Sequence, residues 1–490
     1  MNLHNERLIM SKLLRHLFPL ASVSVLLIFA CNSVYDPVPS PTPSSYSVLA
    51  FSDVHFNPFY DPSLYPKLVA ADPSKWAGIF EGSGIKELST WGSDTNYPLF
   101  KLALSAIRQN RGSSQVILFT GDLVGHYIPK YFYESYYGKT DYPNPPSAAA
   151  AAAMEAFTDK TVTFVTSQIR SVAGNVPVVF AVGNIDSYTG DGPDSTFLSR
   201  NWQTLYTQLL NGSTKEQPFV NTFITGGYYA AQPLGPGLLV LGLNTNPFAQ
   251  GVPGDTSAAV NAELLWLDSE LASAQAAGQK VWILMHVPPG ADALTTARNA
   301  AAANTPSHIT STTAAMMWVQ SYQSNFLGTL TKYPGVITLL LAAHTHMDEY
   351  RILSANNVLE QLPAISPCFG ENPAFKIFTV AANTFTPTDY QSLNYDLAAL
   401  PAGFNNFYTF STTYNLHGAV QSSLASLYPE LVANGTMQAT YEYQYNSGND
   451  SISPATQASW NSINSTNWPI FACGISKVDE QDFIGCVNSY

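Results

Sequence analysis

The sequence predicts an α/β fold built as a layered β-sandwich flanked by helices. Short apolar runs of strand length recur through most of the 490 residues, and helical patterns separate several of them. Each run leads into a polar residue that is able to bind a metal ion or a ligand. Layered α/β sheets gather functional groups at their strand ends, so we expect these polar residues to meet at one site.

Six strands of the buried type support this prediction. They are expected at residues 47–51, 115–120, 176–182, 237–243, 280–285 and 336–343. The polar residues that follow them are Asp53, Asp122, Asn184, Asn244, His286 and His344. Ser147 is placed to cap the second of three predicted helices, which are expected at residues 99–109, 149–172 and 261–276.

The N-terminus carries a targeting signal. Lys12, Arg15 and His16 precede an apolar stretch at residues 17–30, which is too short for an easy membrane span and ends at Cys31. The stretch resembles a bacterial lipobox, whose cysteine is acylated after cleavage. We therefore expect an exported protein, either a periplasmic or cell-surface lipoprotein anchored in a membrane through acylated Cys31 or, alternatively, a secreted protein.

Four regions follow from these patterns. Residues 1–31 form the signal peptide and lipobox, and residues 32–46 form a Pro/Ser-rich linker that favours extended conformations. Residues 47–393 carry all the polar strand ends and form the main, catalytic domain. From residue 394 the ligand motifs stop, and amphipathic stretches such as 419–434 predict a C-terminal helical extension over 394–490.

Composition limits the possible partners. The chain is 46% hydrophobic and 12% aromatic, as expected of a well-packed globular protein. Its net charge of −13 argues against a structural role in nucleic-acid binding. A phosphate-bearing substrate is still compatible with this charge, because bound divalent cations reverse the sign of the local field.

Four cysteines are present, and Cys31 belongs to the lipobox. Cys473 and Cys486 lie close together in the C-terminal tail and could form a disulfide in an oxidising compartment. Cys368 is then left over, and we expect it to be a buried free thiol. None of the four has the spacing of a metal ligand.

The polar strand ends form an ordered set of five motifs. Each motif is a weak signal alone, but together they include four of the nine histidines: Asp53-x-His55, Gly121-Asp122, Gly183-Asn184, His286 and His344-x-His346. Carboxylate, imidazole and amide oxygen are suitable ligands for Zn, Mn or Fe, and one carboxylate can bridge two ions. The absence of thiolates argues against a structural zinc cage.

This ordered set resembles the calcineurin-like metallophosphoesterase family, whose pattern is D-x-H, G-D, G-N-[HN]-[DE], H and G-H-x-H. The resemblance covers roughly residues 48–378. It is closest to the acid sphingomyelinase-like phosphodiesterases and endopolyphosphatases, because of Gly121-Asp122-x-x-x-His126, Asn244-Thr245-Asn246, Ser366-Pro367 and Asn372-Pro373-Ala374-Phe375. The pair Cys473 and Cys486 also resembles the closing disulfide of that group.

The resemblance implies two divalent metal ions, with Zn as the first expectation and Mn or Fe as alternatives. Asp122 would bridge the two ions and count as a catalytic residue. The other ligands would be Asp53, His55 and His346 for one ion, and Asn184, His286 and His344 for the other. The implied reaction is hydrolysis of a phosphoric ester, with a diester favoured, by in-line attack of a metal-bridging hydroxide.

A further histidine, His126, matches a residue of the family that orients the scissile phosphate or protonates the leaving group. The alternative is an ordinary surface histidine on a loop. A Tyr-rich insert at residues 127–142 follows it. We expect the insert to be a packed lid, with a stacking surface for a base or headgroup as the alternative.

The sequence departs from the family at two positions. Ala343 replaces a glycine, a small-for-small change that should leave metal binding intact. Ile185 replaces a histidine or asparagine and can neither donate a proton nor hydrogen-bond a phosphate, whereas Asp186 remains available to orient a neighbouring group. Because of Ile185, two alternatives stay open: a polyphosphate or nucleotide phosphohydrolase, and a catalytically silent metal-binding surface lipoprotein.

Overall fold

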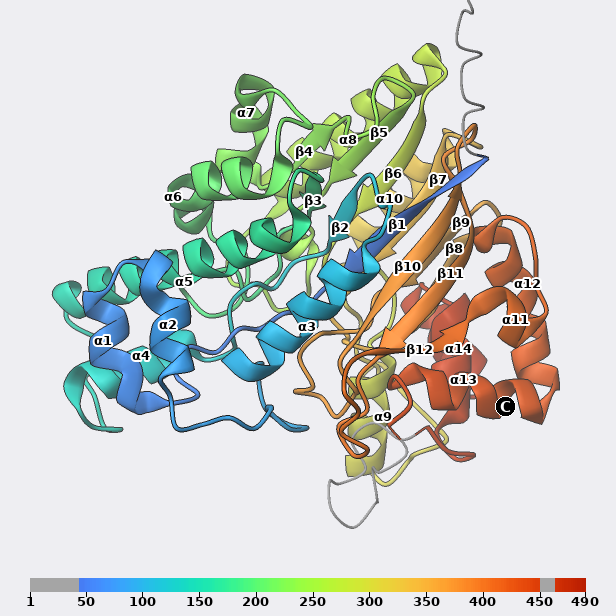
Figure 1. Ribbon diagram of the computed structural model, residues 1–490. Helices are drawn as coiled ribbons and strands as arrows, with labels where there is room; N and C mark the ends of the chain where they lie inside the picture. The colour runs from blue at the N-terminus through green and yellow to red at the C-terminus, as the bar shows by residue number, and fades with distance from the viewer. Residues whose placement is uncertain (1–43, 450–462) are drawn as a thin grey trace, which may run out of the picture. The chain divides into compact units, whose positions relative to one another are not determined.

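The computed structural model describes residues 44–449 and 463–490 (Figure 1). The predicted signal peptide and lipobox, and the linker up to residue 43, lie outside the described residues. Export and lipid anchoring therefore stay predictions. The described residues group into one unit by their internal contacts.

Two six-stranded sheets form the centre of this unit. The first has the order β12-β11-β10-β1-β2-β3 and the second the order β4-β5-β6-β7-β9-β8. The strands of the first sheet are β1 (Ser45–Phe51), β2 (Ile117–Phe119), β3 (Val178–Phe180), β10 (Ala374–Ala381), β11 (Thr386–Asn394) and β12 (Asn405–Thr409). Those of the second are β4 (Tyr229–Ala231), β5 (Leu238–Gly242), β6 (Lys280–Leu284), β7 (Ile337–Ala342), β8 (Tyr350–Ser354) and β9 (Asn357–Gln361).

All six strands predicted from the sequence are present, as β1, β2, β3, β5, β6 and β7. Strands β1, β2 and β3 run parallel, and so do β5, β6, β7 and β9. Their carboxyl ends therefore lie at the same edge of each sheet, which brings the polar residues after them together.

The two sheets pack face to face, which confirms the predicted β-sandwich. Side chains alternate along β6: Trp282 and Leu284 belong to the core shared with the first sheet, whereas Val281 and Ile283 belong to a second core. This alternation follows from the two-residue period of a strand. Trp282 also joins the layers by donating from Nε1 to the Phe385 carbonyl at 2.8 Å.

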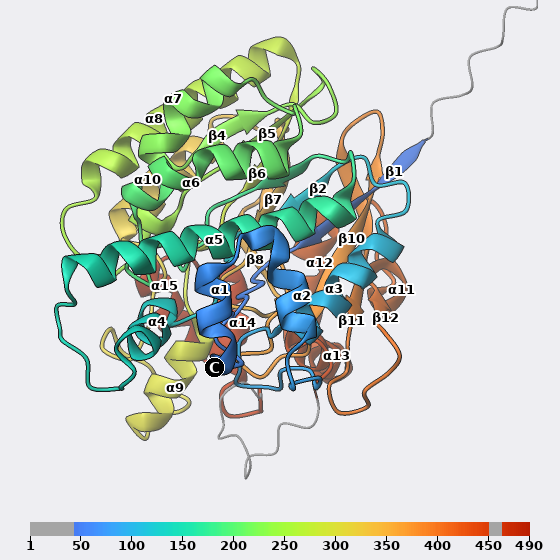
Figure 2. The same ribbon diagram turned by 60° about the vertical axis from the view of Figure 1, so that its left-hand side comes forward.

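Helices cover the outer faces of the sandwich. Helices α3 (Tyr97–Asn110) and α5 (Ala148–Ala173) lie on the first sheet (Figure 2), and α8 (Ser257–Ala277) and α10 (Gln320–Thr331) contribute to the core behind the second. Ser147 caps α5 as predicted, accepting from the Ala150 N–H at 3.2 Å. The other helices before residue 400 are α1 (Tyr65–Ala70), α2 (Trp76–Glu81), α4 (Ile128–Tyr137), α6 (Ser195–Leu205), α7 (Glu216–Gly226) and α9 (Ala293–Ala302).

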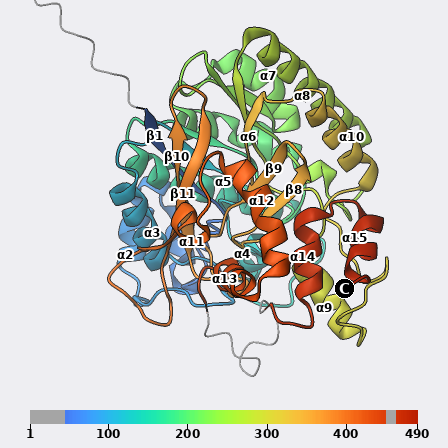
Figure 3. The same ribbon diagram turned by 90° about the vertical axis from the view of Figure 1, so that its right-hand side faces the viewer.

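The C-terminal region is mostly helical. It contains α11 (Phe410–Tyr414), α12 (Val420–Ala433), α13 (Gly435–Tyr445), α14 (Trp468–Ser476) and α15 (Glu480–Val487). Figure 3 shows α12 and α14 lying over β8 and β9. Strand β12 also lies beyond residue 394 yet pairs with β11, and the boundaries of the predicted regions stay predictions.

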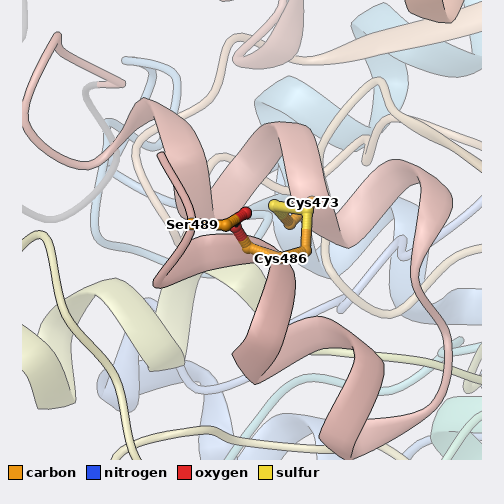
Figure 4. The surroundings of a disulfide bond; sticks show 3 residues. All are labelled: Cys473, Cys486 and Ser489. Atoms are coloured by element: carbon orange, nitrogen blue, oxygen red, sulfur yellow. Dashed lines mark hydrogen bonds between the residues drawn. A yellow bond between two sulfur atoms is a disulfide. The ribbon is translucent and has the colours of Figure 1, made fainter.

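The predicted disulfide is present. Cys473 of α14 and Cys486 of α15 are bonded at 2.05 Å, and Ser489 donates to the Cys486 carbonyl beside them (Figure 4). Among the described residues, no helix combines the length and apolar character needed to cross a bilayer.

Candidate functional site

The loops that leave the strands bend sharply at the predicted ligands. Five of these residues have left-handed backbone conformations, with φ of 48° at Asp53, 41° at His55, 61° at Asp122, 73° at His344 and 68° at His346. Non-glycine residues rarely adopt this region, at a cost of about 1–3 kcal/mol each when they are strained. Such clustering of unfavourable backbone is typical of functional sites.

Two glycines allow the loops after β2 and β3 to touch. A Cβ on Gly121 would lie 2.5 Å from the backbone nitrogen of Gly183. A Cβ on Gly183 would lie 2.0 Å from Oδ1 of Asp122. No side chain fits at either position, so the glycines of the Gly-Asp and Gly-Asn motifs are required by close approach.

The predicted ligands of the first ion lie together and are buried. The Nε2 atoms of His55 and His346 are 3.1 Å apart. Nε2 of His346 lies 3.4 Å from Oδ1 of Asp53, and Nε2 of His55 lies 3.3 Å from Oδ2 of Asp122. All four side chains are at most 2% exposed.

The predicted ligands of the second ion lie beside them. Oδ1 of Asn184 is 2.9 Å from both Nε2 of His286 and Nδ1 of His344. Nε2 of His286 is 3.1 Å from Oδ2 of Asp122. The same Asp122 oxygen is therefore close to a histidine of each group, which is the position that a bridging carboxylate requires.

These residues fit divalent ions. Both side-chain oxygens of Asp53 are buried without a hydrogen-bond partner, an unfavourable state for a carboxylate unless a cation completes it. Ligands that share an ion at about 2.0–2.2 Å are separated by about 3–3.5 Å, as these side-chain atoms are. The set of nitrogen and oxygen donors, without thiolate, suits Zn, Mn or Fe.

The protonation of two histidines is also relevant to metal binding. Burial, together with the neighbouring His286, lowers the pKa of His344 to about 4, so its imidazole is neutral at pH 7. Burial also lowers the pKa of His286. The carboxylates of Asp122 and Asp53 outweigh this effect and raise the pKa to about 9. Binding of a cation at His286 would therefore release a proton.

Acceptors behind the histidines orient their rings. Nδ1 of His55 donates to the Val124 carbonyl at 3.2 Å, and Nδ1 of His286 donates to the Thr120 carbonyl at 2.7 Å. Nδ1 of His346 lies 2.7 Å from Oε1 of the buried Glu371. Each contact leaves Nε2 directed at the cluster, an arrangement common around metal ligands. The role of Glu371 was not predicted from the sequence, because no motif links it to His346.

Asp186 holds the two glycine loops together. Its carboxylate accepts from the N–H groups of Asp122 at 3.1 Å, Leu123 at 2.8 Å and Gly183 at 3.0 Å. Burial and the charge of Asp122 raise its pKa to about 7. Ile185 is buried, and its N–H donates to Oδ1 of Asp122 at 2.9 Å. Position 185, where the family pattern has a histidine or asparagine, thus contributes a backbone N–H to the site.

His126 lies at the edge of the cluster and is partnered by Asp94. Its Nδ1 is 2.8 Å from Oδ1 of Asp94, and its ring stacks on His55 at 4.0 Å. Burial would lower the pKa of His126, but hydrogen bonds with Asp94 and Cys368 outweigh it and raise the pKa to about 11. The side chain is 21% exposed. Asp94, which lies 32 residues earlier, was also missed by the sequence analysis.

Cys368 is a free thiol, as expected, but it is half-buried rather than buried. Its Sγ lies 3.5 Å from Nδ1 of His346, next to Phe369, whose ring packs on His346 at 4.5 Å. Phe369 lines the cavity of the site, so this loop forms part of an open wall and its thiol is not enclosed in the core.

In the Tyr-rich insert, α4 packs against α5, whereas Tyr127 is 65% exposed and its ring lies 6.1 Å from that of His126. Both earlier interpretations of the insert, as a lid and as a stacking surface, are compatible with this arrangement.

Two adjoining cavities open at the cluster. One of about 210 Å³ is lined by Asp122, His126, Asn184, His344 and His346, together with Arg298 and Phe369. A second, of about 450 Å³, shares Asn184, Asp191, Asp292, Met317 and His344 with the first. A third cavity of about 620 Å³, between α9 and α14, meets the first at Leu294 and Arg298. It contains none of the clustered side chains, so we place the site in the first cavity.

A family model described as calcineurin-like phosphoesterase matches residues 46–348. The chain belongs to this family. The match includes every residue of the five ligand motifs and His126, and it confirms the resemblance seen in the sequence.

Curated relatives lie in the predicted branch of the family. The chain is 22% identical to sphingomyelinase phosphodiesterase C of Dictyostelium discoideum, over 64% of this chain and 64% of that protein. It is 24% identical to human sphingomyelin phosphodiesterase, over 60% of this chain and 46% of that protein. It is 23% identical to human cyclic GMP-AMP phosphodiesterase SMPDL3A, over 83% of each. The chain therefore spans less than two thirds of the length of the first two.

Proposed function

We propose that the chain hydrolyses phosphoric diesters with two divalent metal ions. The observation that carries the proposal is the convergence of the two groups of ligand-type side chains at Asp122, beside Asp53, whose buried oxygens have no hydrogen-bond partner among the described residues. One ion would be held by Asp53, His55, Asp122 and His346, and the other by Asp122, Asn184, His286 and His344. When bound, such ions supply Lewis-acid stabilisation of phosphoryl oxygens and a water molecule of lowered pKa. Zn is our first expectation, and Mn and Fe are the alternatives.

The chain itself supplies the proton for the leaving group. Hydrogen bonds with Asp94 and Cys368 outweigh burial and raise the pKa of His126, which favours its protonated form. Asp94 occupies Nδ1, which leaves Nε2 as the nitrogen that donates to the departing oxygen. Ile185 cannot assist, so His126 acts without the second histidine of sphingomyelinase-like members.

The two cavities that meet at the cluster favour a diester over a monoester. A diester carries two substituents on its phosphate, and the cavities of about 210 and 450 Å³ could each take one. A monoester would use only one of them.

Charge disfavours the polyphosphate alternative. Among the described residues that line the two cavities, Arg298 is the one Lys or Arg and lies in the smaller cavity, whereas Asp191 and Asp292 line both cavities. A chain of phosphates entering the larger cavity would meet like charge. The non-catalytic alternative rests on Ile185 and predicts bound metal without turnover.

The proposal is tested with the purified chain from residue 32 onward, which keeps the whole of β1, supplied with Zn or Mn or treated with chelator. We expect metal-dependent hydrolysis of bis-(p-nitrophenyl) phosphate that exceeds hydrolysis of p-nitrophenyl phosphate. Activity that survives complete metal removal would refute the metal mechanism. Two bound ions per chain without cleavage of either ester would favour the non-catalytic alternative.

We also propose that the protein is exported, as the N-terminal signal indicates. The Cys473–Cys486 disulfide supports this, because such bonds persist in oxidising compartments. Metabolic labelling with a fatty acid, compared between the full chain and Cys31→Ala, separates a lipoprotein from a secreted protein.

A further inference from the structure

The cavity of about 450 Å³ is lined mostly by apolar residues and glycines, but its polar lining includes the carboxylates of Asp191 and Asp292 and the amide of Asn246. We propose that it is a subsite for one substituent of the diester, and that it selects a substituent bearing hydrogen-bond donors, above all a primary ammonium group, against a negatively charged one. This inference rests on the proposed function. The cavity begins at Asn184 and His344, so a group attached to a phosphate at the metal site would extend directly into it.

Asn246 carries a hydrogen-bond acceptor, Oδ1, that has no partner among the described residues. It is 2% exposed, and its Nδ2 donates to the Gly183 carbonyl at 2.9 Å. This bond fixes which way the amide faces, because a carbonyl can only accept. Its Oδ1 is buried without a hydrogen-bond partner, and the residue lines the cavity. A buried acceptor left unpaired is costly, so a donor on the ligand would be favourable there.

Two carboxylates add negative charge to the same cavity. Asp191 accepts from Nδ2 of Asn184 at 2.9 Å, and Asp292 accepts from the N–H of Thr295 at 2.8 Å as the N-cap of α9. Each of these bonds uses only part of the accepting capacity of a carboxylate. The described residues that line the cavity include no Lys or Arg. Met316 and Met317 supply an adaptable apolar wall for the carbon chain of the substituent.

The test uses a matched series of p-nitrophenyl phosphodiesters whose second substituent is n-butyl, 3-hydroxypropyl, 3-aminopropyl or 2-carboxyethyl. The substituents have similar sizes and differ in donors and charge. We expect kcat/KM for the aminopropyl ester to exceed that for the butyl ester by about 10-fold or more, with the hydroxypropyl ester between them and the carboxyethyl ester lowest.

The variant Asp292→Asn removes one charge and keeps an oxygen that can cap α9. We expect it to reduce the aminopropyl-to-butyl ratio several-fold and to change the hydroxypropyl-to-butyl ratio less. Asp255→Asn is the matched control, because Asp255 is an exposed carboxylate that accepts from the Ser257 N–H and is not itself among the residues that line the cavity. We expect this control to keep the wild-type ratios.

The ratios distinguish failure of the subsite from failure of the proposed function. Hydrolysis of every ester at similar kcat/KM would overturn the subsite and leave the phosphodiesterase proposal standing. A higher kcat/KM for the hydroxypropyl ester than for the aminopropyl ester would overturn the proposed role of the carboxylates. Absence of metal-dependent hydrolysis for all four esters would overturn the proposed function itself.

Discussion

Two buried polar clusters lie close together in the chain and differ in how far their polar groups are paired within the protein. The site cluster contains Asp53, His55, Asp122, His286 and His346. The lysine cluster contains Lys376, Asp348, Glu360, Tyr390 and Tyr408. Both are almost inaccessible to solvent. The two clusters are neighbours in the sequence, because Asp348 of the lysine cluster follows His346 of the site cluster by two residues.

The charged groups of the lysine cluster are paired with one another within the protein, and only Oε1 of Glu360 lacks a hydrogen-bond partner among the described residues of the cluster. Nζ of Lys376 lies 2.7 Å from Asp348 and 2.7 Å from Glu360, and it is 4.4 Å from the ring centre of Tyr390. Tyr408 donates to Asp348 at 2.9 Å. The backbone of the lysine cluster is also ordinary, since Lys376, Asp348 and Glu360 all lack a positive φ.

The site cluster is not satisfied in this way. Both oxygens of Asp53 lack a hydrogen-bond partner, imidazole nitrogens face one another, and several residues have left-handed backbone. A buried polar group is normally paired, so these departures identify the part of the molecule that is shaped for something outside the chain. We therefore expect substitutions in the site cluster to reduce activity, and substitutions in the lysine cluster to reduce stability.

The largest expected effect is on activity. Asp122→Ala removes the carboxylate that lies near a histidine of each ligand group. We expect kcat/KM for a diester to fall at least about a thousandfold, with less than two metal ions bound per chain. Steady-state kinetics and elemental analysis of the same sample check both expectations. A variant that keeps both ions and the wild-type rate would contradict the site assignment.

The next effect is on stability. Lys376→Met leaves Asp348 and Glu360 buried without their cation, and breaking a buried pair in this way costs about 3–5 kcal/mol. We expect a free energy of unfolding lower by that amount in urea titration. The activity per folded molecule should stay close to that of the wild type. Loss of activity with unchanged stability would show that the lysine cluster has a functional role instead.

A smaller effect on rate is expected at His126. In His126→Gln the proton donor is lost but none of the proposed metal ligands is changed. We expect about a 100-fold lower kcat for a diester with an alkyl leaving group, and a smaller loss for p-nitrophenolate, which leaves without a proton. Equal losses for both leaving groups would argue that His126 positions the phosphate instead.

The smallest effect concerns pH and stability. The folded pKa of His126 is about 11, above the unfolded value of about 6.5, so its pairing with Asp94 stabilises the protein fully below pH 6.5. That stabilisation is lost as pH rises from 6.5 through 11. We expect Asp94→Asn to be about 1–2 kcal/mol less stable than wild type at pH 6, with a smaller difference at pH 10. A pH-independent difference in urea titrations would contradict this assignment.

Much of the fold was predictable because its strands are short, apolar and followed by polar residues. The six strands, the Ser147 cap and the disulfide are all found in the structure. The proposed ligands also lie together, since parallel strands deliver them to one edge. The strands and the cap depend on residues close in the chain, whereas the disulfide was indicated by the short separation of its cysteines and by the family resemblance.

The supporting residues could not be predicted in the same way. Asp94 reaches His126 across 32 residues, and Glu371 reaches His346 across 25. Asp94 lies in no motif, and although Glu371 directly precedes the Asn372-Pro373-Ala374-Phe375 motif, nothing in that motif links it to His346. The exposure of Cys368 likewise depends on how its loop borders the cavity. Contacts that tertiary packing creates leave no periodic signal in the sequence.

The left-handed backbone at Asp122 has a practical consequence. Asparagine tolerates this conformation better than most residues and has nearly the shape of aspartate. Asp122→Asn should therefore keep the loop and the surrounding cavities while removing the bridging charge. Such a variant would show whether the charge of Asp122, and not the shape of its loop, is what holds the two ions. Its metal content, measured beside that of Asp122→Ala, would separate the charge from the backbone that carries it.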